Sequence, residues 1–262
     1  MRLSPFAPID AAFAPAPDPA RTAWLRGQTF AHRGAHDYIQ GGSRIENSSA
    51  AFAEAIRRGL GIECDVQRSR DGRAMVFHDW ELDRLTGESG PVAARDAAAL
   101  GRIALKGSGE GIPTLDALLD QVAGRVPLLI EIKSRREVRP IPLCLAVRRA
   151  LEGYRGEHAV MSFDPRVVRW FALHSPDTLR GLVMTEEHDR GARGAARRHS
   201  ALWLSRAQFL AYDVRDLPSR FAAAQRRRGL PLLTWTVRSP ELAERAAAEA
   251  DSPIAEGTGL AG

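Results

Sequence analysis

The sequence predicts an α/β fold, a (β/α)8 TIM barrel formed as a single domain. Short apolar runs of strand length alternate with segments of helical pattern along the chain, which is typical of a parallel α/β protein. About eight such runs occur, and this number favours a closed barrel over an open doubly wound sheet. The length of 262 residues, 44% of them hydrophobic, suits one barrel domain.

The segment before the first apolar run, residues 1–27, is rich in proline and alanine, and we expect an extended arm there. The barrel domain is therefore placed at 28–262. The arm lacks a charged stretch followed by an apolar run, so it does not resemble a signal peptide. No stretch approaches the roughly 20 apolar residues of a membrane span, and the two cysteines lie far apart. We expect a cytoplasmic protein with no stable membrane insertion.

The first half of the barrel contains one irregular unit. We expect strands at 28–32, 61–66 and 74–79, and a helix at 47–58 that Asn47 or Ser48 caps and Gly59 ends. The gap at 67–73 is shorter than the roughly 10–12 residues of a helical crossover, so this unit lacks its helix. Residues 79–112 have few large apolar residues in regular spacing, and we expect an insertion there, over one end of the barrel.

The second half is more regular, with apolar runs and amphipathic segments in alternation. Helices are expected at 115–124 and 142–154, and strands at 127–133, 158–163, 180–185, 209–214 and 230–237.

The net charge of +5 raises the question of nucleic-acid binding. The densest basic cluster, QRRRG at 225–229, is better explained as a helix end, where cations meet the negative end of the dipole and glycine stops the helix. Aromatic residues for base stacking are not interleaved with it. We expect no nucleic-acid partner.

Carboxylates follow one another on two of the predicted strands. Side chains alternate across a strand, so Glu63 and Asp65 share one face while Cys64 takes the other. Glu131 and Lys133 likewise share a face at the end of 127–133. A divalent cation with oxygen ligands is the natural partner of such carboxylates. The alternatives are a solvated polar strand end for the first pair and a surface ion pair for the second.

Two histidines end predicted strands, His32 the first and His78 the third. The carboxyl ends of barrel strands open on one rim, where active sites lie. Two imidazoles beside a cation suit phosphodiester cleavage, in which one removes a proton and the other donates one. The other five histidines have no comparable setting, namely residues 36, 158, 174, 188 and 199.

Together these motifs resemble the glycerophosphodiester phosphodiesterase family over roughly residues 28–257. The order and spacing of the motifs are more specific than any one of them. They are HRG at 32–34, EN at 46–47, IECDV at 62–66, DG at 71–72, FHD at 77–79, DRLTG at 83–87, IPTLDALL at 112–119, EIK at 131–133, SFDP at 162–165 and TWTV at 234–237.

The resemblance implies a (β/α)8 barrel with a small insertion after the third strand, and it implies a role for each site residue. Glu63, Asp65 and Glu131 would hold one divalent cation, Mg²⁺ or Ca²⁺, and His32 and His78 would be the acid–base pair. Four substrate-binding residues complete the site: Arg33 and Lys133 at the phosphate, Glu46 beside the first histidine and arginine, and Trp235, on the last strand, at the apolar side of the glycerol. Plain barrel core is an equal alternative for Trp235, and Asn47 would cap the helix it begins.

Three departures from the family pattern stand out. Ile45 replaces a proline, Ser48 replaces a threonine, and Glu256 lies near the usual aspartate of the last motif. The hydroxyl of Ser48 is retained, and no function is assigned to Glu256. The long glycine-bearing loop at 35–45 would affect the size of substrate accepted.

The expected reaction is metal-dependent hydrolysis of a small glycerophosphodiester to sn-glycerol 3-phosphate and an alcohol. A lysophospholipase D or sphingomyelinase D acting on lipids is the alternative; it would need an apolar patch at the barrel mouth. A non-enzymatic binding barrel would not need both histidines and all three carboxylates. The headgroup, the choice between direct attack by water and a cyclic intermediate, and the oligomeric state stay open.

Overall fold

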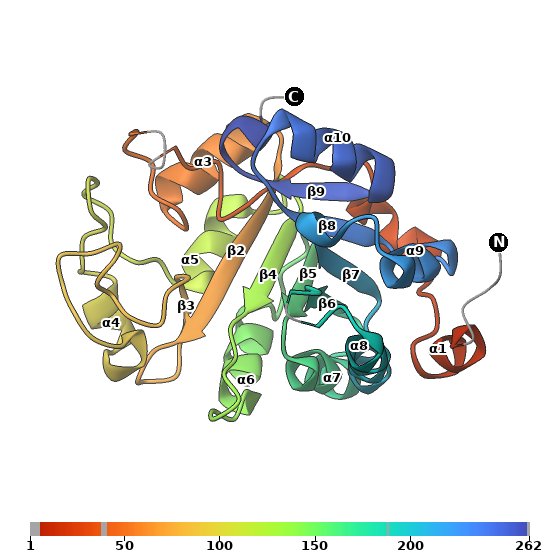
Figure 1. The fold of residues 1–262 in the computed structure, drawn as a ribbon. Coiled ribbons are helices and arrows are strands. Elements are labelled where there is room, and N and C mark those ends of the chain that lie inside the picture. Colours follow the sequence, from red (N-terminus) through yellow and green to blue (C-terminus); the bar gives the residue numbers. More distant parts are fainter. Residues whose placement is uncertain (1–5, 38–40, 188, 261–262) are drawn as a thin grey trace.

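The structure, a computed structural model, describes residues 6–37, 41–187 and 189–260. Its centre is a closed barrel of eight parallel strands with helices packed around the outside (Figure 1). The first strand pairs with both the second and the last, and these pairings close the barrel. The barrel strands are β1 (Phe30–Ala31), β2 (Gly61–Arg68), β4 (Leu128–Ile132), β5 (His158–Ser162), β6 (Leu179–Met184), β7 (Phe209–Asp213), β8 (Leu232–Val237) and β9 (Ser252–Ala255).

The predicted barrel is confirmed, but two strand assignments need correction. The third strand, β3 (Ala74–Val76), runs antiparallel to β2 and lies outside the barrel, because the short Asp71–Gly72 turn can only return the chain as a hairpin. The missing barrel strand is β9, four residues that include Ser252 and Pro253. Trp235 therefore lies on the seventh barrel strand, not on the last.

Most crossovers between barrel strands carry a helix whose first turn is closed by a polar side chain. Ser48, Thr114, Asp164, Ser219 and Ser239 each accept a hydrogen bond from a backbone N–H two or three residues later. The helices are α3 (Ser49–Arg57), α5 (Leu115–Val122), α6 (Ile141–Ala150), α7 (Pro165–His174), α8 (Ala192–Ser205), α9 (Arg220–Arg227) and α10 (Pro240–Glu249), with short 3₁₀ helices at Val214–Asp216 and Gly257–Leu260.

The stretch between β3 and α5 forms an insertion with its own apolar cluster. It holds a 3₁₀ turn at Val92–Ala94 and the short helix α4 (Ala97–Leu100), and it lies beside β2 and β3 (Figure 1). Its apolar residues are few and irregularly spaced because they come from turns, yet they pack together with Met75 and Phe77. Arg135, after β4, lies 4.1 Å over the ring of Trp80 and ties the insertion to the barrel rim.

The N-terminal segment is helical rather than extended over much of its described length. It forms α1 (Ala7–Phe13), α2 (Pro19–Thr22) and a 3₁₀ turn at Ala23–Leu25. Prolines lie in the first turns of both helices, where no backbone N–H is needed. Helix α1 packs on α8 through Asp10, which is fully buried. Within the described residues, no helix has the length and apolar character needed to cross a membrane.

The side chains along each strand point alternately into two apolar layers, one inside the barrel and one between the barrel and the helices. Inside the barrel, Phe30, Leu129, Met161 and Phe209 pack together with other inward residues. Outward residues such as Cys64 pack against the surrounding helices. Glu63 and Asp65 therefore point into the barrel, as alternation along 61–66 predicts.

Candidate active site

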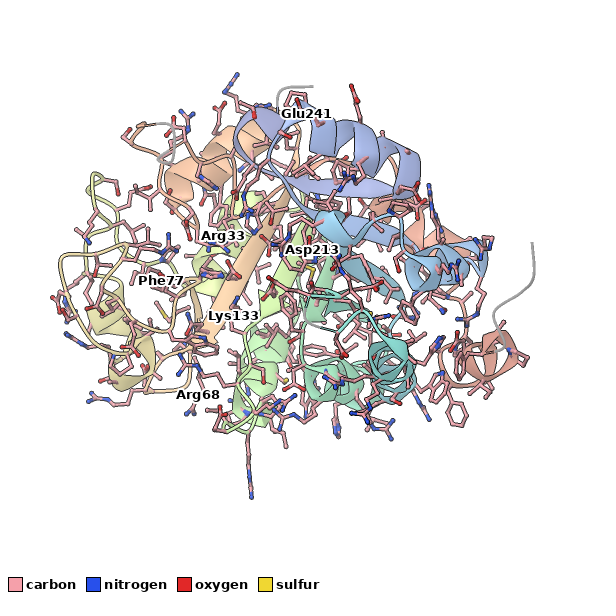
Figure 2. The ribbon with its side chains drawn as sticks, in the orientation of Figure 1. Arg33, Arg68, Phe77, Lys133, Asp213 and Glu241 are labelled. Atoms are coloured by element: carbon pink, nitrogen blue, oxygen red, sulfur yellow. The ribbon has the colours of Figure 1, made fainter. Side chains whose placement is uncertain are left out.

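The carboxyl ends of the barrel strands surround a cavity of about 290 Å³. Arg33, Lys133 and Asp213, which come from well-separated parts of the chain, lie around this opening (Figure 2). Of the nine residues that the sequence predicts for the site, seven line the cavity: His32, Arg33, Glu63, His78, Glu131, Lys133 and Trp235. The other two, Glu46 and Asp65, lie directly behind it in contact with Arg33.

Glu63, Asp65 and Glu131 form one cluster on the inner face of the barrel. Asp65 and Glu131 are register partners on β2 and β4. Each of the three carboxylates offers an oxygen, and these oxygens lie within 4.8 Å of one another. Three oxygen donors brought together from two strands are the ligand set that hard divalent cations take. The residues present therefore fit a Mg²⁺ or Ca²⁺ ion.

Two cationic side chains partly neutralise this cluster. The Arg33 backbone N–H donates to Glu63 at 3.0 Å, and its side-chain Nε lies 3.1 Å from Asp65. The Lys133 Nζ donates to Glu131 at 3.0 Å and lies 3.4 Å from Asp65. Lysine, a compact point charge, can serve two carboxylates from one position.

The electrostatics of the cluster are uneven. Burial, together with the neighbouring charges of Asp65 and Glu131, raises the pKa of Glu63 well above its ordinary value. Burial also raises the pKa of Glu131, although Lys133 opposes the shift. Burial acts to raise the pKa of Asp65 as well, but the charges of Arg33 and Lys133 outweigh it and lower that pKa. Asp65 is thus the carboxylate most firmly held in its charged form.

His32 directly follows β1, at the rim. Its Nδ1 donates to Glu256, which follows β9, and its Nε2 lies 4.0 Å from Glu63. Because Nδ1 carries the proton in this arrangement, Nε2 of the neutral ring is an acceptor that faces the cavity. Burial lowers the pKa of His32, and the hydrogen bond to Glu256 opposes that shift.

His78 reaches the same cavity by a different route from the one predicted. It follows β3 rather than a barrel strand, so the hairpin and not the barrel geometry brings it to the rim. Its Nδ1 donates to Asp79 at 2.7 Å, which leaves Nε2 as the acceptor. Burial acts to raise the pKa of Asp79, but hydrogen bonds from Arg84 and His78 outweigh it and lower that pKa to about 2.

Glu46 lies behind the cavity and accepts hydrogen bonds from two arginine side chains. One of its oxygens accepts from Arg33 at 2.7 Å and from Arg84 at 2.7 Å, and the other accepts from Arg84 at 3.0 Å. Both oxygens are therefore occupied by arginine. Arg84 also donates to Asp79 at 2.9 Å, so the insertion is linked to both sides of the cavity.

Sequence reasoning did not assign a role at the site to several residues, among them Asn47, Glu256 and Arg84. Asn47, expected as a helix cap, has a positive φ of 58° and donates from its amide to Asp65 at 3.0 Å; Ser48 caps α3 instead. Glu256 is buried beside His32, and its place after an apolar run near the family's usual aspartate was the available signal. Arg84 lies in the DRLTG motif, whose match to the family was the only sign of it.

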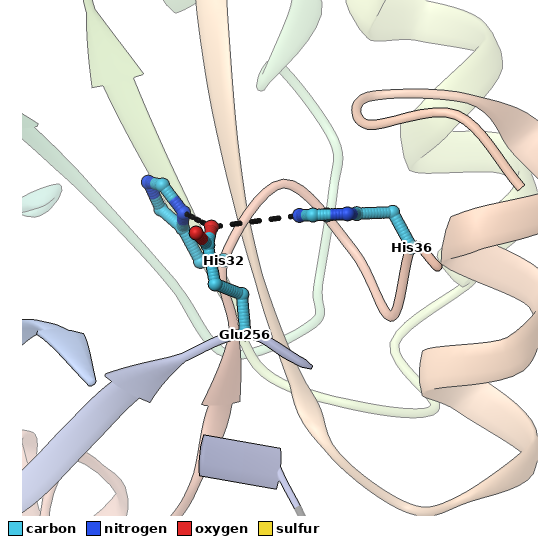
Figure 3. Close-up of side chains that lie close together, drawn as sticks. All are labelled: His32, His36 and Glu256. Carbon is cyan, nitrogen blue, oxygen red and sulfur yellow. Dashed lines mark hydrogen bonds and ion pairs between the residues drawn. The ribbon is translucent and has the colours of Figure 1, made fainter. Parts of the chain in front are cut away.

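His36 is the third partner in the group around Glu256, so the expectation that it has no special setting is wrong. Its Nε2 lies 3.5 Å from the carboxylate oxygen that also faces His32 (Figure 3). His158 and His199 have structural partners, the carbonyl of Gly156 and the carboxylate of Asp10. His174 is exposed at the end of α7, and His188 lies outside the described residues.

An apolar wall closes the other side of the cavity. Trp235 is half-buried, and its indole N–H donates to the Ala211 carbonyl at 3.0 Å, which fixes the ring. Phe163 meets it edge-on with ring centroids 5.3 Å apart and remains 47% exposed. Among the described lining residues, Phe163 is the large apolar side chain that remains exposed.

Comparison with known proteins bears on what this cavity does. A family model described as the glycerophosphoryl diester phosphodiesterase family matches residues 32–252. The protein YhdW of Bacillus subtilis is 27% identical over 223 residues, which cover 82% of this chain and 88% of YhdW.

Solved structures are similar in fold. A glycerophosphodiester phosphodiesterase from Thermotoga maritima gives a TM-score of 0.67 at 24% identity, covering 87% of this chain and 93% of that one. A phosphodiesterase from Oleispira antarctica, solved in complex with the product sn-glycerol-3-phosphate, gives 0.75 at 20% identity, covering 88% of this chain and 93% of that one.

Proposed function

The chain belongs to the glycerophosphoryl diester phosphodiesterase family and is an enzyme of that class, and we propose that it hydrolyses small glycerophosphodiesters to sn-glycerol 3-phosphate and an alcohol. One observation carries the proposal: a single cavity is lined by two histidines, by Glu63 and Glu131 of the carboxylate cluster, and by cationic side chains that include Arg33 and Lys133. This is the set of groups that phosphodiester cleavage needs, namely proton transfer on both sides of phosphorus and positive charge around it.

The two histidines are the proposed acid–base pair. Each imidazole is oriented at Nδ1 by a carboxylate, Glu256 for His32 and Asp79 for His78. Their Nε2 atoms are thus available to the substrate. One accepts the proton of the attacking hydroxyl, and the other, when protonated, donates to the leaving oxygen.

Arg33 and Lys133 are the proposed phosphate ligands from the protein. Both line the cavity, and both are more than four-fifths covered, so their charges act with little screening by water. Glu46 holds the guanidinium of Arg33 in place, and we therefore propose that it positions Arg33 rather than touching the substrate itself. Asn47 positions Asp65 in the same way.

Glu63, Asp65 and Glu131 would hold one divalent cation, Mg²⁺ or Ca²⁺. When bound, such a cation stabilises negative charge on phosphoryl oxygens. Trp235 and Phe163 supply the apolar face against which the carbon skeleton of the glycerol would pack. The barrel domain at 28–262 would act as the catalytic unit, and the insertion at 79–112 would contribute Arg84.

The direct test is release of glycerol 3-phosphate from glycerophosphocholine and glycerophosphoethanolamine, measured with a coupled dehydrogenase in Mg²⁺, in Ca²⁺ and in chelator. We expect release that depends on the cation. Absence of release in every condition would contradict the proposal, and hydrolysis of lysolipid by the same preparation would then favour the lipid-level alternative.

A second readout follows from the repulsion among the three buried carboxylates. A cation that binds the folded state stabilises it by mass action, so the melting temperature should rise with Mg²⁺ or Ca²⁺ and fall with chelator. If neither turnover nor melting temperature responds to chelator, the site works without a metal ion.

A further inference from the structure

A second group of potential ligands lies on the other side of the His32 ring from the carboxylate cluster. His32, His36 and Glu256 are all buried, and each offers one ligand atom within 4.8 Å of the other two. The carboxylate of Glu256 stands between the two imidazole rings (Figure 3). The facing atoms are Nδ1 of His32 and Nε2 of His36, and both point at the same oxygen, Oε2.

The fold builds this group from both edges of the barrel seam. Arg33 and Gly34 adopt positive φ, 55° and 79°, and turn the chain back so that His36 returns beside His32. A side chain at Gly34 would meet Ala51 at 2.9 Å, so only glycine allows this close turn. Glu256 directly follows β9, the strand paired with β1. Its second oxygen, Oε1, accepts from Arg238, which holds the carboxylate in orientation.

Two imidazole nitrogens and one carboxylate oxygen are a donor set that Zn²⁺ takes, with a water in the fourth position. With metal–ligand distances of about 2.1 Å, ligand atoms around a tetrahedral ion lie roughly 3.4 Å apart. The separation of His36 Nε2 from Glu256 Oε2 is 3.5 Å. The contact between His32 and Glu256 is closer, so the ion would replace the proton between them and the two groups would have to move apart.

We propose that His32, His36 and Glu256 form a second metal site, one that takes Zn²⁺ or a similar transition-metal ion. It differs in kind from the cluster of Glu63, Asp65 and Glu131, which offers oxygen alone and suits a hard cation. Imidazole donors favour zinc over magnesium and calcium, so the two sites discriminate between ions by chemistry.

Occupation of this site has a consequence for turnover, which rests on the proposed role of His32. A zinc ion on Nδ1 displaces the proton that Glu256 now accepts, and the neutral ring must then carry its proton on Nε2. In that form Nε2 cannot accept a proton from a hydroxyl in the cavity. Zinc would therefore inhibit the enzyme by fixing the wrong tautomer, without competing for the carboxylate cluster.

The test measures zinc binding directly. The full-length protein is titrated with Zn²⁺ against a chromophoric chelator in excess Mg²⁺, and the same is done for His36→Gln and Glu63→Gln. We expect His36→Gln to weaken zinc binding by at least about tenfold, because one of three protein ligands is lost. Glu63→Gln should leave it unchanged. His174→Gln, at an exposed histidine, controls for binding at the surface.

Equal zinc affinity in the wild type and His36→Gln, or loss of affinity in Glu63→Gln alone, would overturn the proposal. His36→Asn replaces His36→Gln if the latter melts at a lower temperature than the wild type. Turnover with and without zinc is then compared within each variant. Inhibition should be strong in the wild type and weak in His36→Gln, whereas absence of turnover even without zinc would refute the proposed function and leave the binding result intact.

Discussion

His32 and His78 are held in the same manner although they arrive from different elements. Each donates from Nδ1 to a carboxylate, so each presents Nε2 as the acceptor. Their surroundings differ, because the side chain of His32 is 11% exposed and that of His78 is 30% exposed. Two imidazoles in equivalent tautomers and unequal environments are suited to opposite directions of proton transfer.

We expect His32→Ala and His78→Ala each to lower kcat by roughly 10²- to 10⁴-fold, the usual contribution of a general acid or base. Neither ring is part of the main apolar clusters, so circular dichroism should show a folded barrel in both. His174→Ala, at an exposed position on α7, is the matched control and should keep its turnover. Near-normal rates in either site variant would remove that histidine from the acid–base pair.

Sequence reasoning recovered residues whose position follows from strand periodicity. Alternation on 61–66 placed Glu63 and Asp65 on one face, and the end of 127–133 placed Glu131 near them. Sequence reasoning did not place Glu256 and His36 at the site, because their positions depend on closure of the barrel between β1 and β9. It also did not place Asn47 at the site, because an asparagine before a helix is usually a cap, whereas the side chain of Asn47 donates to Asp65.

The insertion is connected to the site by a chain of charged hydrogen bonds. Arg84 joins Asp79, which orients His78, to Glu46, which holds Arg33. Guanidinium groups make several planar hydrogen bonds at once, and this allows one side chain to join two carboxylates. The insertion, which interrupts the alternation of strand and helix, thus aligns Arg33 after β1 with His78 after β3.

Arg84→Gln should lower kcat by roughly ten- to a hundredfold, because His78 and Arg33 lose their common support and small misplacements are costly. KM should change less than kcat, since the substrate-binding side chains remain. Arg84→Lys keeps the positive charge but lacks the planar guanidinium group, so it should restore only part of the rate. Arg102→Gln, at another exposed arginine of the insertion, is the control and should leave kcat unchanged. An unchanged kcat in Arg84→Gln would show that the hydrogen bonds of Arg84 are not needed to position His78 and Arg33.

Two strands show where pattern recognition fails at the level of elements. The run at 74–79 has the apolar content of a barrel strand, and only the short connection before it reveals a hairpin. The true eighth strand is four residues long and contains proline, a residue that strands usually exclude. The predicted number of about eight barrel strands is therefore correct, although the prediction counted β3 as a barrel strand and missed β9.

The molecule as a whole includes the N-terminal helix as part of its packing. Asp10 on α1 accepts from Nδ1 of His199 at 2.8 Å, from the indole of Trp203 at 2.8 Å and from Gln225 at 2.7 Å. These partners lie on α8 and α9. A fully buried carboxylate that accepts from three donors therefore holds the segment before β1 against α8 and α9.

Asp10→Ala should destabilise the fold by on the order of 3 kcal/mol, because buried donors on α8 and α9 lose their acceptor. For a chain of this size, such a loss lowers the melting temperature by roughly 6–12 °C. Asp120→Ala, at an exposed position of α5, should shift it little. Equal melting temperatures in the two variants would mean that α1 adds nothing to the stability of the barrel.

The seam between β1 and β9 also sets the order in which the enzyme becomes competent during synthesis. His32 leaves the ribosome 224 residues ahead of Glu256, the carboxylate that orients it. Until β9 emerges, β1 lacks one of its two neighbouring strands, and the first histidine has no fixed tautomer. A translation product cut short before this point contains the three carboxylates of the Glu63, Asp65 and Glu131 cluster and both histidines, yet it lacks the carboxylate that orients His32.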